Sequence, residues 1–280
     1  MTRHIALVTF VLLLSFSPLF AQKKFEQSRE FGLVGGTGYY IGDINPYGHF
    51  GGILSLGAGA MYRENISRRW SVKGQVFYGT IAASDADADN AWRQNRNLSF
   101  RNEIIEGSCT VELNYKNYQI GTKGDGFSPY VFMGLAIYSH RPQGEFNGRW
   151  VELQPLGTEG QGTSEGGDFY ALRGLAVPFG VGIKLNLIGT LAINVEWGMR
   201  KVWTDYLDDV SGMYADPAVL ADESGPLTVA MADRSLVIPE GRENLTGMER
   251  GDSGRNDWYN FTTVTLSLRL GKAPTTCWNQ

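Results

Sequence analysis

The adjacent residues Ser139 and His140 are the first place where this sequence could support nucleophilic catalysis. A serine hydrolase needs a serine, a histidine and an acid within mutual reach, because the histidine takes the serine proton. The segment 128–140 has the alternation of a β-strand, and adjacent residues on a strand point to opposite faces. We therefore expect no catalytic pair here and no enzyme activity. His49 is the only other histidine beyond residue 4, too few for a histidine-rich metal site.

Three aspartates at alternate positions, Asp85, Asp87 and Asp89, have the spacing of the first ligands of an EF-hand calcium loop. The match ends there, because Asn90 stands at the sixth position, where glycine is needed, and Arg96 at the twelfth, where a bidentate glutamate is needed. We interpret the segment as a solvated acidic loop and keep the three aspartates as weak calcium candidates. No other metal and no cofactor is expected.

A second acidic cluster contains an aromatic side chain. Its members, Asp205, Tyr206, Asp208 and Asp209, follow directly on a predicted strand. Such a cluster could bind a cation or a partner at the rim of a sheet. It could equally cap the strand and fold the following loop through aspartate–backbone hydrogen bonds. The sequence leaves both interpretations open.

The two cysteines are Cys109, in the middle of a predicted strand, and Cys277, near the C-terminus. If Cys109 faces outward from its strand and Cys277 follows the last strand, their α-carbons cannot approach to the roughly 6 Å of a disulfide. Cys277 is then a free thiol. It could form an intermolecular disulfide or remain an unreacted thiol in the tail.

The composition excludes several classes of protein. The 280 residues carry a formal net charge of −4, so the chain lacks the basic surface of a nucleic-acid-binding protein. Two cysteines exclude a small domain held together by disulfides. A hydrophobic content of 42% is too high for a disordered chain. The 36 glycines have no collagen-like period and suit close packing between strands.

Residues 1–21 have the pattern of a secretory signal peptide. Arg3 and His4 precede the apolar run 5–16, and Ala21 provides the small residue before the cut. The run is too short to span a bilayer, and no later stretch reaches 18 apolar residues. We expect export across the inner membrane and one mature domain, 22–280, with a short tail at 271–280.

Eight segments of the mature chain alternate between apolar and polar or small residues with the period of a β-strand. They are 30–41, 54–63, 70–78, 105–115, 128–140, 175–187, 191–200 and 263–270. Most are long for strands of a soluble protein, and each has one apolar face and one face of Gly, Ser, Thr and scattered charges. Apolar residues facing outward and polar residues facing inward are typical of outer-membrane barrels. The sequence therefore predicts an all-β fold, an eight-stranded antiparallel up-and-down transmembrane β-barrel with long outer loops.

An eight-stranded barrel has an interior that side chains just fill, so no open pore is expected. Charged residues on the inward face must then pair with one another, because an unpaired buried charge is costly. The predicted interior network consists of Lys73, Glu106, Glu112, Lys184, Glu196, Arg200 and Arg269.

The lengths of the predicted connections indicate how the barrel is oriented. Segments 82–102, 141–174 and 202–257 are long, whereas 64–69 and 188–190 are short. Outer-membrane barrels have short periplasmic turns and longer outer loops. We expect an outer-membrane protein of a Gram-negative bacterium, surrounded by lipids, with both termini in the periplasm.

Several segments, in order along the chain, resemble one family. They are 36–43 (GTGYYIGD), 96–100 (RNLSF) leading to Glu106 and Glu112, 127–132 (FSPYVF), 156–162 (LGTEGQG), 178–184 (PFGVGIK), 196–200 (EWGMR), 204–211 (TDYLDDVS) and 257–259 (DWY). This combination resembles the PorG proteins of the type IX secretion system of Bacteroidota, and it extends over nearly the whole mature chain.

The resemblance implies a non-enzymatic part of a protein secretion machine. PorG-like barrels are associated with a periplasmic ring of the lipoprotein PorK and of PorN, which they would anchor or organise. A ring partner needs periplasmic surface, and the tail segments 22–29 and 272–280 are the best contact candidates. Two other roles remain open for a barrel of this kind, surface adhesion through the loops and passage of small solutes.

Overall fold

The computed structural model describes residues 27–49, 55–122 and 124–271, and these residues form nine β-strands. Eight long strands are β1 (Ser28–Ile41), β2 (Ser55–Asn65), β3 (Trp70–Ser84), β4 (Ser99–Asn114), β5 (Phe127–Phe146), β7 (Arg173–Ile188), β8 (Leu191–Val202) and β9 (Trp258–Leu270). The ninth, β6 (Arg149–Glu152), is a short strand that pairs only with the end of β5.

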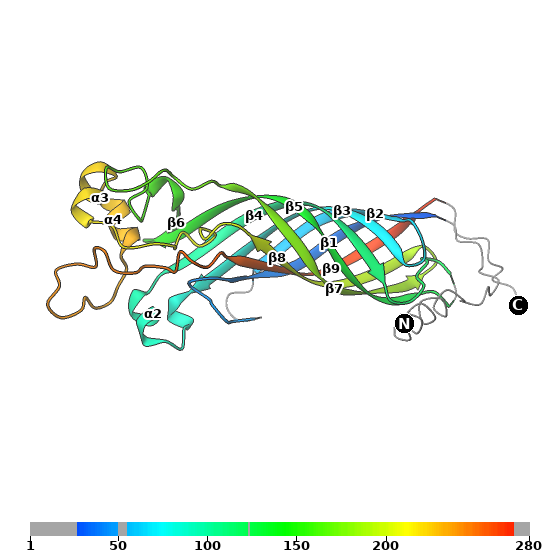
Figure 1. The fold of residues 1–280 in the computed structure, drawn as a ribbon. Helices are drawn as coiled ribbons and strands as arrows, with labels where there is room; N and C mark the ends of the chain where they lie inside the picture. The colour runs from blue at the N-terminus through cyan, green and yellow to red at the C-terminus, as the bar shows by residue number, and fades with distance from the viewer. Residues whose placement is uncertain (1–26, 50–54, 123, 272–280) are drawn as a thin grey trace, which may run out of the picture.

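The eight long strands close into a barrel (Figure 1). Each pairs antiparallel with the next long strand along the chain, and β1 also pairs with β9. This closure leaves no long strand with an open edge, which is how a barrel avoids edge-to-edge association. The predicted all-β, eight-stranded antiparallel barrel is confirmed.

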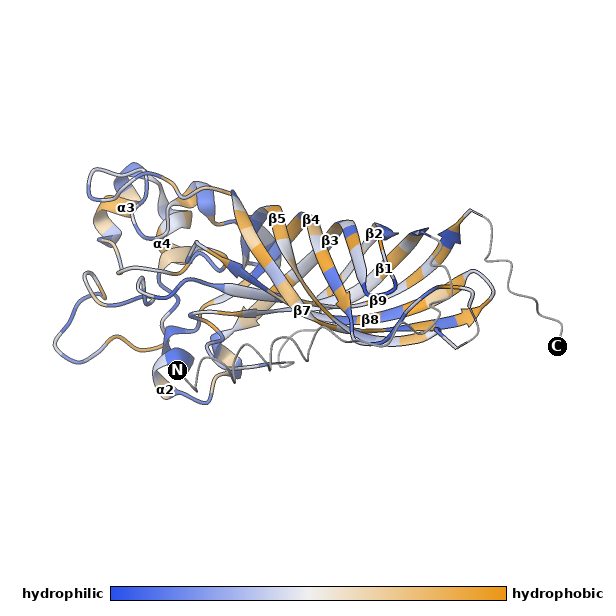
Figure 2. Ribbon diagram, turned by 45° about the vertical axis from the view of Figure 1, so that its right-hand side comes forward, coloured by the Kyte–Doolittle hydropathy of each residue, from blue (hydrophilic) through white to orange (hydrophobic). Residues whose placement is uncertain are grey.

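Alternation along each strand separates an apolar outward face from a filled interior. On β5, Val131, Leu135 and Ile137 are exposed on one face, whereas Phe132 and Tyr138 are buried on the other. Figure 2 shows apolar residues recurring along the barrel strands in this way. The exposed side chains form an apolar band around the barrel.

Aromatic rings fill the interior toward one end of the barrel. The ring of Tyr40 packs edge-on against that of Phe100, with 4.9 Å between centroids, and Phe77 packs 4.6 Å from Phe261. A β-carbon added at Gly79 would meet both Phe77 and Phe261. The glycine therefore provides the space that these two rings occupy.

The two ends of the barrel differ strongly. One end, here the turn end, carries the short connections 66–69, 115–126 and 189–190, together with the start of β1 and the end of β9. The other, the loop end, carries segments 42–49, 85–98, 147–172 and 203–257 (Figure 1). Its short helices are η1 (Asp85–Asp87), α2 (Ala91–Arg96), η2 (Gln154–Leu156), α3 (Pro217–Glu223) and α4 (Pro226–Ala232).

Two predicted loops are shorter than expected. The prediction 82–102 was wrong at both ends, because β3 and β4 continue to pair as far as Ser84 and Ser99. The prediction 141–174 was wrong because β5 runs on to Phe146 and forms a hairpin with β6. Backbone pairing continues beyond the apolar band, where outward residues such as Glu103 and Gln143 are polar and inward residues such as Ile81 and Phe100 are apolar, so the alternation that revealed the strands is lost.

Two predicted segments lie outside the described residues. They are the signal peptide, 1–21, and the tail from residue 272 onward, which includes Cys277. Within the described part of the chain, no helix has the length and hydrophobicity to cross a membrane.

Candidate functional site

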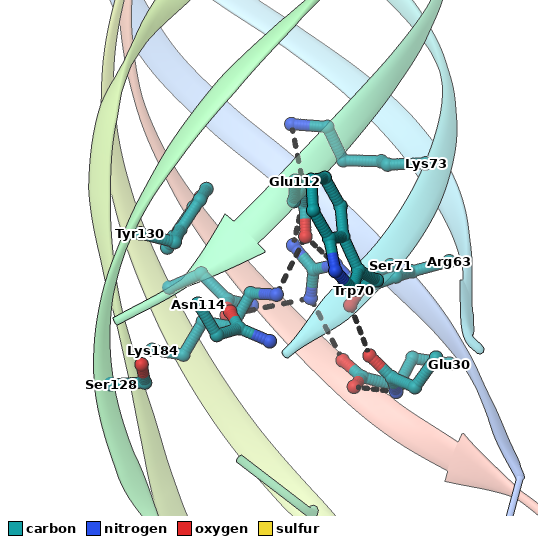
Figure 3. Close-up of polar contacts among 12 residues, drawn as sticks. Glu30, Arg63, Trp70, Ser71, Lys73, Glu112, Asn114, Ser128, Tyr130 and Lys184 are labelled. Atoms are coloured by element: carbon teal, nitrogen blue, oxygen red, sulfur yellow. Dashed lines mark hydrogen bonds and ion pairs between the residues drawn. The ribbon is translucent and has the colours of Figure 1, made fainter. Parts of the chain in front are cut away.

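The turn-end half of the interior is crossed by a network of ion pairs (Figure 3). Arg63, which is 1% exposed, lies between two carboxylates: its Nη1 is 2.9 Å from Oε2 of Glu30 and its Nε is 2.8 Å from Oε2 of Glu112. The same Glu112 accepts a hydrogen bond of 2.6 Å from Nζ of Lys184. Nζ of Lys73 lies 3.7 Å from the other oxygen of Glu112. One carboxylate thus faces three cations.

The network continues from Lys73 to Glu196. Nζ of Lys73 donates to Oε2 of Glu196 at 2.5 Å, and the hydroxyl of Tyr130 donates to the same oxygen at 2.7 Å. At its other side, the hydroxyl of Ser267 donates to Glu30 at 3.1 Å. We call this set the ionic plug. Its members are Glu30 (β1), Arg63 (β2), Lys73 (β3), Glu112 (β4), Tyr130 (β5), Lys184 (β7), Glu196 (β8) and Ser267 (β9).

Every strand of the barrel therefore contributes one member to the ionic plug. Its three carboxylates and three cations balance formally, so the buried charges compensate one another without an added ion. Breaking such a pair leaves an uncompensated buried charge, and the plug therefore holds the strands together across the interior.

A second ion pair lies nearer the loop end. Nε of Arg200 is 3.0 Å from Oε2 of Glu106, and the hydroxyl of Tyr259 donates to the same oxygen at 2.9 Å. Nη1 of Arg200 also donates to the carbonyl of Gly198 at 2.6 Å. Together with the aromatic rings above it, this pair fills the middle of the barrel.

Segment 115–126 closes the barrel interior at the turn end. Tyr118 and Ile120 of this segment are fully buried. Arg269, the last residue of the predicted interior network, donates to the carbonyl of Ile120 at 2.9 Å, and Asn186 donates to the carbonyl of Gln119 at the same distance. The connection is folded into the barrel mouth, and the interior is closed beneath the ionic plug.

The acidic cluster predicted at the rim is buried at the loop end. The hydroxyl of Tyr40 lies 2.5 Å from Oδ2 of Asp208 and 2.9 Å from Oδ1 of Asp257. The other oxygens of the two aspartates accept hydrogen bonds from the backbone N–H groups of Val210 and Leu207. These contacts tie the loop after β8 to the ends of β1 and β9.

Asp209 links the same loop to the segment before β7. It accepts hydrogen bonds from the hydroxyls of Thr158 at 2.5 Å and Tyr170 at 2.6 Å. Arg250, itself buried, approaches Asp209 and forms an ion pair of 2.9 Å with Glu159. Tyr206 stacks on Tyr170 with 4.4 Å between ring centroids. The cluster thus joins distant loop segments, as the capping interpretation expected.

Burial shifts the acidity of these carboxyl groups. It raises the pKa of Asp205 to about 8 and the pKa of Asp209 to about 6, and it raises the pKa of Asp208 and of Asp257 well above the ordinary value. In each case the cause is the removal of the carboxyl group from water, which disfavours the charged form.

The three weak calcium candidates lie in different environments. Asp85 is fully buried, and its carboxylate accepts hydrogen bonds of 2.7 and 2.8 Å from Arg96, whereas Asp87 and Asp89 are exposed. Across the described ranges, no three acidic, histidine or cysteine side chains are grouped so that they could hold a metal ion. Arg96, the residue at the glutamate position of the calcium motif, therefore neutralises Asp85 directly.

Ser139 and His140 point to opposite faces of β5, as the alternation predicts. His140 is buried, and its Nε2 donates to the carbonyl of Ala171 at 3.2 Å while Nδ1 faces the amide nitrogen of Asn102 at 3.2 Å. The imidazole is held by these two groups in a structural role. Cys109 is exposed on the outward face of β4, as expected.

Several residues of these clusters were not predicted from the sequence. Glu30 lies in a strand whose alternation is weak at its start, and Arg63 follows inward-facing Gly57 and Gly59 without a charged neighbour on the same face. The alternation of inward and outward positions along β1 and β2 could have placed both residues in the interior. Arg250 and Asp257 lie in a loop with no periodic pattern, and no local signal marks them.

Comparisons with known proteins give one family and a set of distant barrels. Ail of Yersinia pestis is 8% identical over 87% of this chain and 97% of its own, with a TM-score of 0.39. Neisserial surface protein A is 4% identical over 88% and 100%, with a TM-score of 0.38. The N-terminal barrel domain of Pseudomonas aeruginosa OprF is 10% identical over 86% and 97%, with a TM-score of 0.35. No curated protein matches the chain.

The family model matches residues 5–220, which include β1 to β8 and most of α3, whereas β9 lies beyond the match. Its description is "Domain of unknown function (DUF6089)". The match extends over more than three quarters of the sequence, and the chain belongs to the DUF6089 family.

Proposed function

We propose that this protein is an integral β-barrel of the outer membrane of a Gram-negative bacterium. The support is the apolar band: Leu33, Leu135 and Leu175 are 66, 71 and 64% exposed on strands of a closed barrel. A continuous belt of exposed aliphatic side chains is unfavourable in water and favourable against lipid chains. The turn end lies in the periplasm together with both chain termini, because short turns of such barrels face that side.

Within the membrane the protein acts as a non-enzymatic component of the type IX secretion system that anchors or organises a periplasmic ring of PorK-like and PorN-like proteins. The observation that carries this proposal is the ionic plug, to which all eight barrel strands contribute. A cross-linked and closed interior suits a rigid anchor. The secretion role itself rests on the sequence resemblance to PorG proteins.

The ring contacts belong at the turn end in this proposal. Segments 66–69, 115–126 and 189–190 lie there, and Ile188 is 79% exposed beside the last of them. Of the two tail segments favoured by the sequence, 22–29 and 272–280, only residues 27–29 are described, and they border this surface; 22–26 and 272–280 lie outside the described residues.

The test is purification of the tagged full-length protein from outer membranes in mild detergent, followed by mass spectrometry. The proposal predicts that PorK-like and PorN-like proteins co-purify. Non-reducing electrophoresis of the same samples tests Cys277: an adduct should disappear in Cys277→Ser and persist in the matched control Cys109→Ser. Recovery of the barrel alone, from membranes that contain the ring proteins, would contradict the anchor role.

Surface adhesion is the second candidate, and one observation favours it. Leu236 and Val237 are 69 and 66% exposed in the long loop, and hydrogen bonds to Asn95 hold them in place. Loss of binding to a host surface in Leu236→Ser/Val237→Ser, with intact secretion, would favour this role. Passage of small solutes has no such support, because the ionic plug and segment 115–126 occupy the interior.

A further inference from the structure

Four neighbouring barrel strands carry a basic residue on the outward face near the loop end. These are Arg101 on β4, Arg141 on β5, Arg173 on β7 and Lys201 on β8, and we call them the basic border. Strand alternation places Arg101, Arg141 and Arg173 on the same outward face as Ile105, Ile137 and Leu175, which are exposed further along the three strands. The basic border therefore begins where the apolar band ends.

Arg141 and Arg173 lie close together. Ser139 pairs in register with Arg173, and Arg141 is two residues further along β5 on the same face. The two arginines are thus diagonal neighbours, with α-carbons about 7 Å apart. Both side chains are exposed, and within the described ranges neither guanidinium has a hydrogen bond or an ion pair. Two exposed guanidinium groups thus belong to diagonal positions of adjacent strands.

The other two members flank this pair. Lys201 lies over the ring of Trp258, with Nζ 4.5 Å from the centroid, and Arg101 lies over Trp150 at 4.2 Å. Glu103 is in register with Arg141, but its carboxylate lies 3.8 Å from Arg101. At the level of the basic border one acid therefore accompanies four cations, whereas Glu145 and Glu152 lie further toward the loop end.

The turn end also carries basic residues, and two of them are paired with acids. Arg29 lies 3.6 Å from Glu64, and Arg68 lies 3.4 Å from Asp125. On the neighbouring strands, Ala82 of β3 is in register with Arg101, and Ile41 of β1 is in register with Trp258, the partner of Lys201, so the adjacent positions on β3 and β1 carry no charge. At the level of the basic border, the positive charge therefore lies on the side formed by β4, β5, β7 and β8.

An apolar groove on the outward face begins at Ile137 and Leu175, next to the basic border, and extends across β4, β3 and β2 to Phe31 of β1. Its volume is about 720 Å³, and Gly107, Leu135, Ile137 and Leu175 contribute to its lining. A β-carbon added at Gly107 would meet only Ile137, at 3.7 Å, so the missing side chain helps to hollow the groove. A groove of this kind can accept an acyl chain whose headgroup lies at the level of Arg141 and Arg173.

We propose that the basic border and this groove form a binding site for a phosphate-bearing lipid in the leaflet on the loop side. The arginines bind the phosphate, because the planar guanidinium group matches phosphate oxygens in a bidentate geometry. Lys201 and Arg101 add positive charge at the flanks, and the groove holds an acyl chain. The site rests on the proposed insertion into the outer membrane and is independent of the secretion role.

The test uses the full-length protein in nanodiscs of phosphatidylcholine that contain either diphosphoryl lipid A or the same lipid without its phosphates. Native mass spectrometry measures the lipid retained by the protein. The wild type should retain the phosphorylated lipid, and Arg141→Gln/Arg173→Gln should lower the affinity roughly tenfold, the equivalent of one charge-assisted contact. Arg29→Gln is the matched control and should bind as the wild type does.

Two further measurements separate the parts of the site. Gly107→Leu fills the groove and should reduce retention while both arginines remain. Inorganic phosphate, added as a competitor, should not displace the lipid, because it lacks the acyl chain. The proposal is overturned if the double arginine variant binds like the wild type, if the phosphate-free lipid binds equally well, or if inorganic phosphate competes fully. None of these outcomes depends on recovery of the ring proteins.

Discussion

The hydroxyl group of Tyr40 lies 2.5 Å from Oδ2 of Asp208, and this contact joins the first barrel strand to the longest loop. The same hydroxyl lies 2.9 Å from Asp257, yet it carries a single proton and can donate to one carboxylate only. The second short contact therefore requires a proton on one of the two aspartates. The buried loop end is held together in part by a retained proton.

This geometry predicts that the loop end loosens as the pH rises. A carboxyl group whose pKa is higher in the folded state stabilises it fully below the unfolded value, and this contribution is lost as the pH passes the folded value. Burial raises the pKa of Asp208 and of Asp257 well above the ordinary value and raises the pKa of the neighbouring Asp205 to about 8, so the loss begins above about pH 4 and, at Asp205, extends to about pH 8. Hydrogen exchange of segment 203–257 should accelerate over this range.

The matched variant for this prediction is Asp257→Asn. The amide cannot ionise and can still donate a hydrogen bond to Tyr40, so the pH dependence of exchange should become weaker. Other charged groups also act on the two aspartates. Asp43 raises the pKa of Asp208 and Asp205 raises the pKa of Asp257, whereas Arg96 lowers the pKa of Asp208. Exchange that is independent of pH in the wild type, or slows as the pH rises, would refute the retained proton.

The ionic plug predicts a strong effect of Glu112→Gln. The substitution removes the charge that faces Arg63, Lys73 and Lys184, and a broken buried ion pair costs about 3–5 kcal/mol. Thermal unfolding followed by circular dichroism should show a clear drop in Tm. Glu103→Gln, on the outward face of the same strand, is the control and should leave Tm nearly unchanged. Equal effects of the two substitutions would show that the plug does not stabilise the barrel.

Segment 115–126 should detach from the barrel mouth in Ile120→Asp. Ile120 is fully buried, and an unpaired carboxylate at this position costs several kcal/mol. Trypsin added from the turn side should then cleave after Lys116 in the variant and spare the wild type. Ile188→Asp introduces the same charge at an exposed position and should remain resistant. Resistance of both variants would place Ile120 outside the closure of the mouth.

The thermal stability of the protein should depend on Asp85 in the acidic segment 85–89 and should not depend on calcium. Asp85 binds Arg96 and also accepts a hydrogen bond from the backbone of Leu98 at 3.1 Å. Asp85→Asn should therefore lower the free energy of unfolding by about 1–3 kcal/mol, the cost of weakening a buried charged hydrogen bond, and Tm should fall with it. Chelation of calcium should leave the Tm of the wild type unchanged. A rise in Tm on adding calcium would restore the calcium hypothesis.

The two-residue alternation along the strands made much of the barrel predictable from sequence. Lys73, Glu112 and Lys184 were assigned to the interior by alternation alone, and all three are buried there. The contacts of the loop end could not be predicted in this way. Arg250 reaches Glu159 across 91 residues of sequence, and both lie in segments without periodicity. Such pairs depend on how the loops fold over the barrel mouth, which local pattern does not encode.

Site-specific photo-crosslinking at the turn end tests the central claim most directly. A photo-reactive residue at Ile188, exposed beside the turn 189–190, should form adducts with PorK-like or PorN-like proteins in intact cells. The same residue at Leu236, exposed at the loop end, should form none with them. Adducts from Leu236 and not from Ile188, or no ring adduct from either position in cells that assemble the ring, would contradict the anchor role.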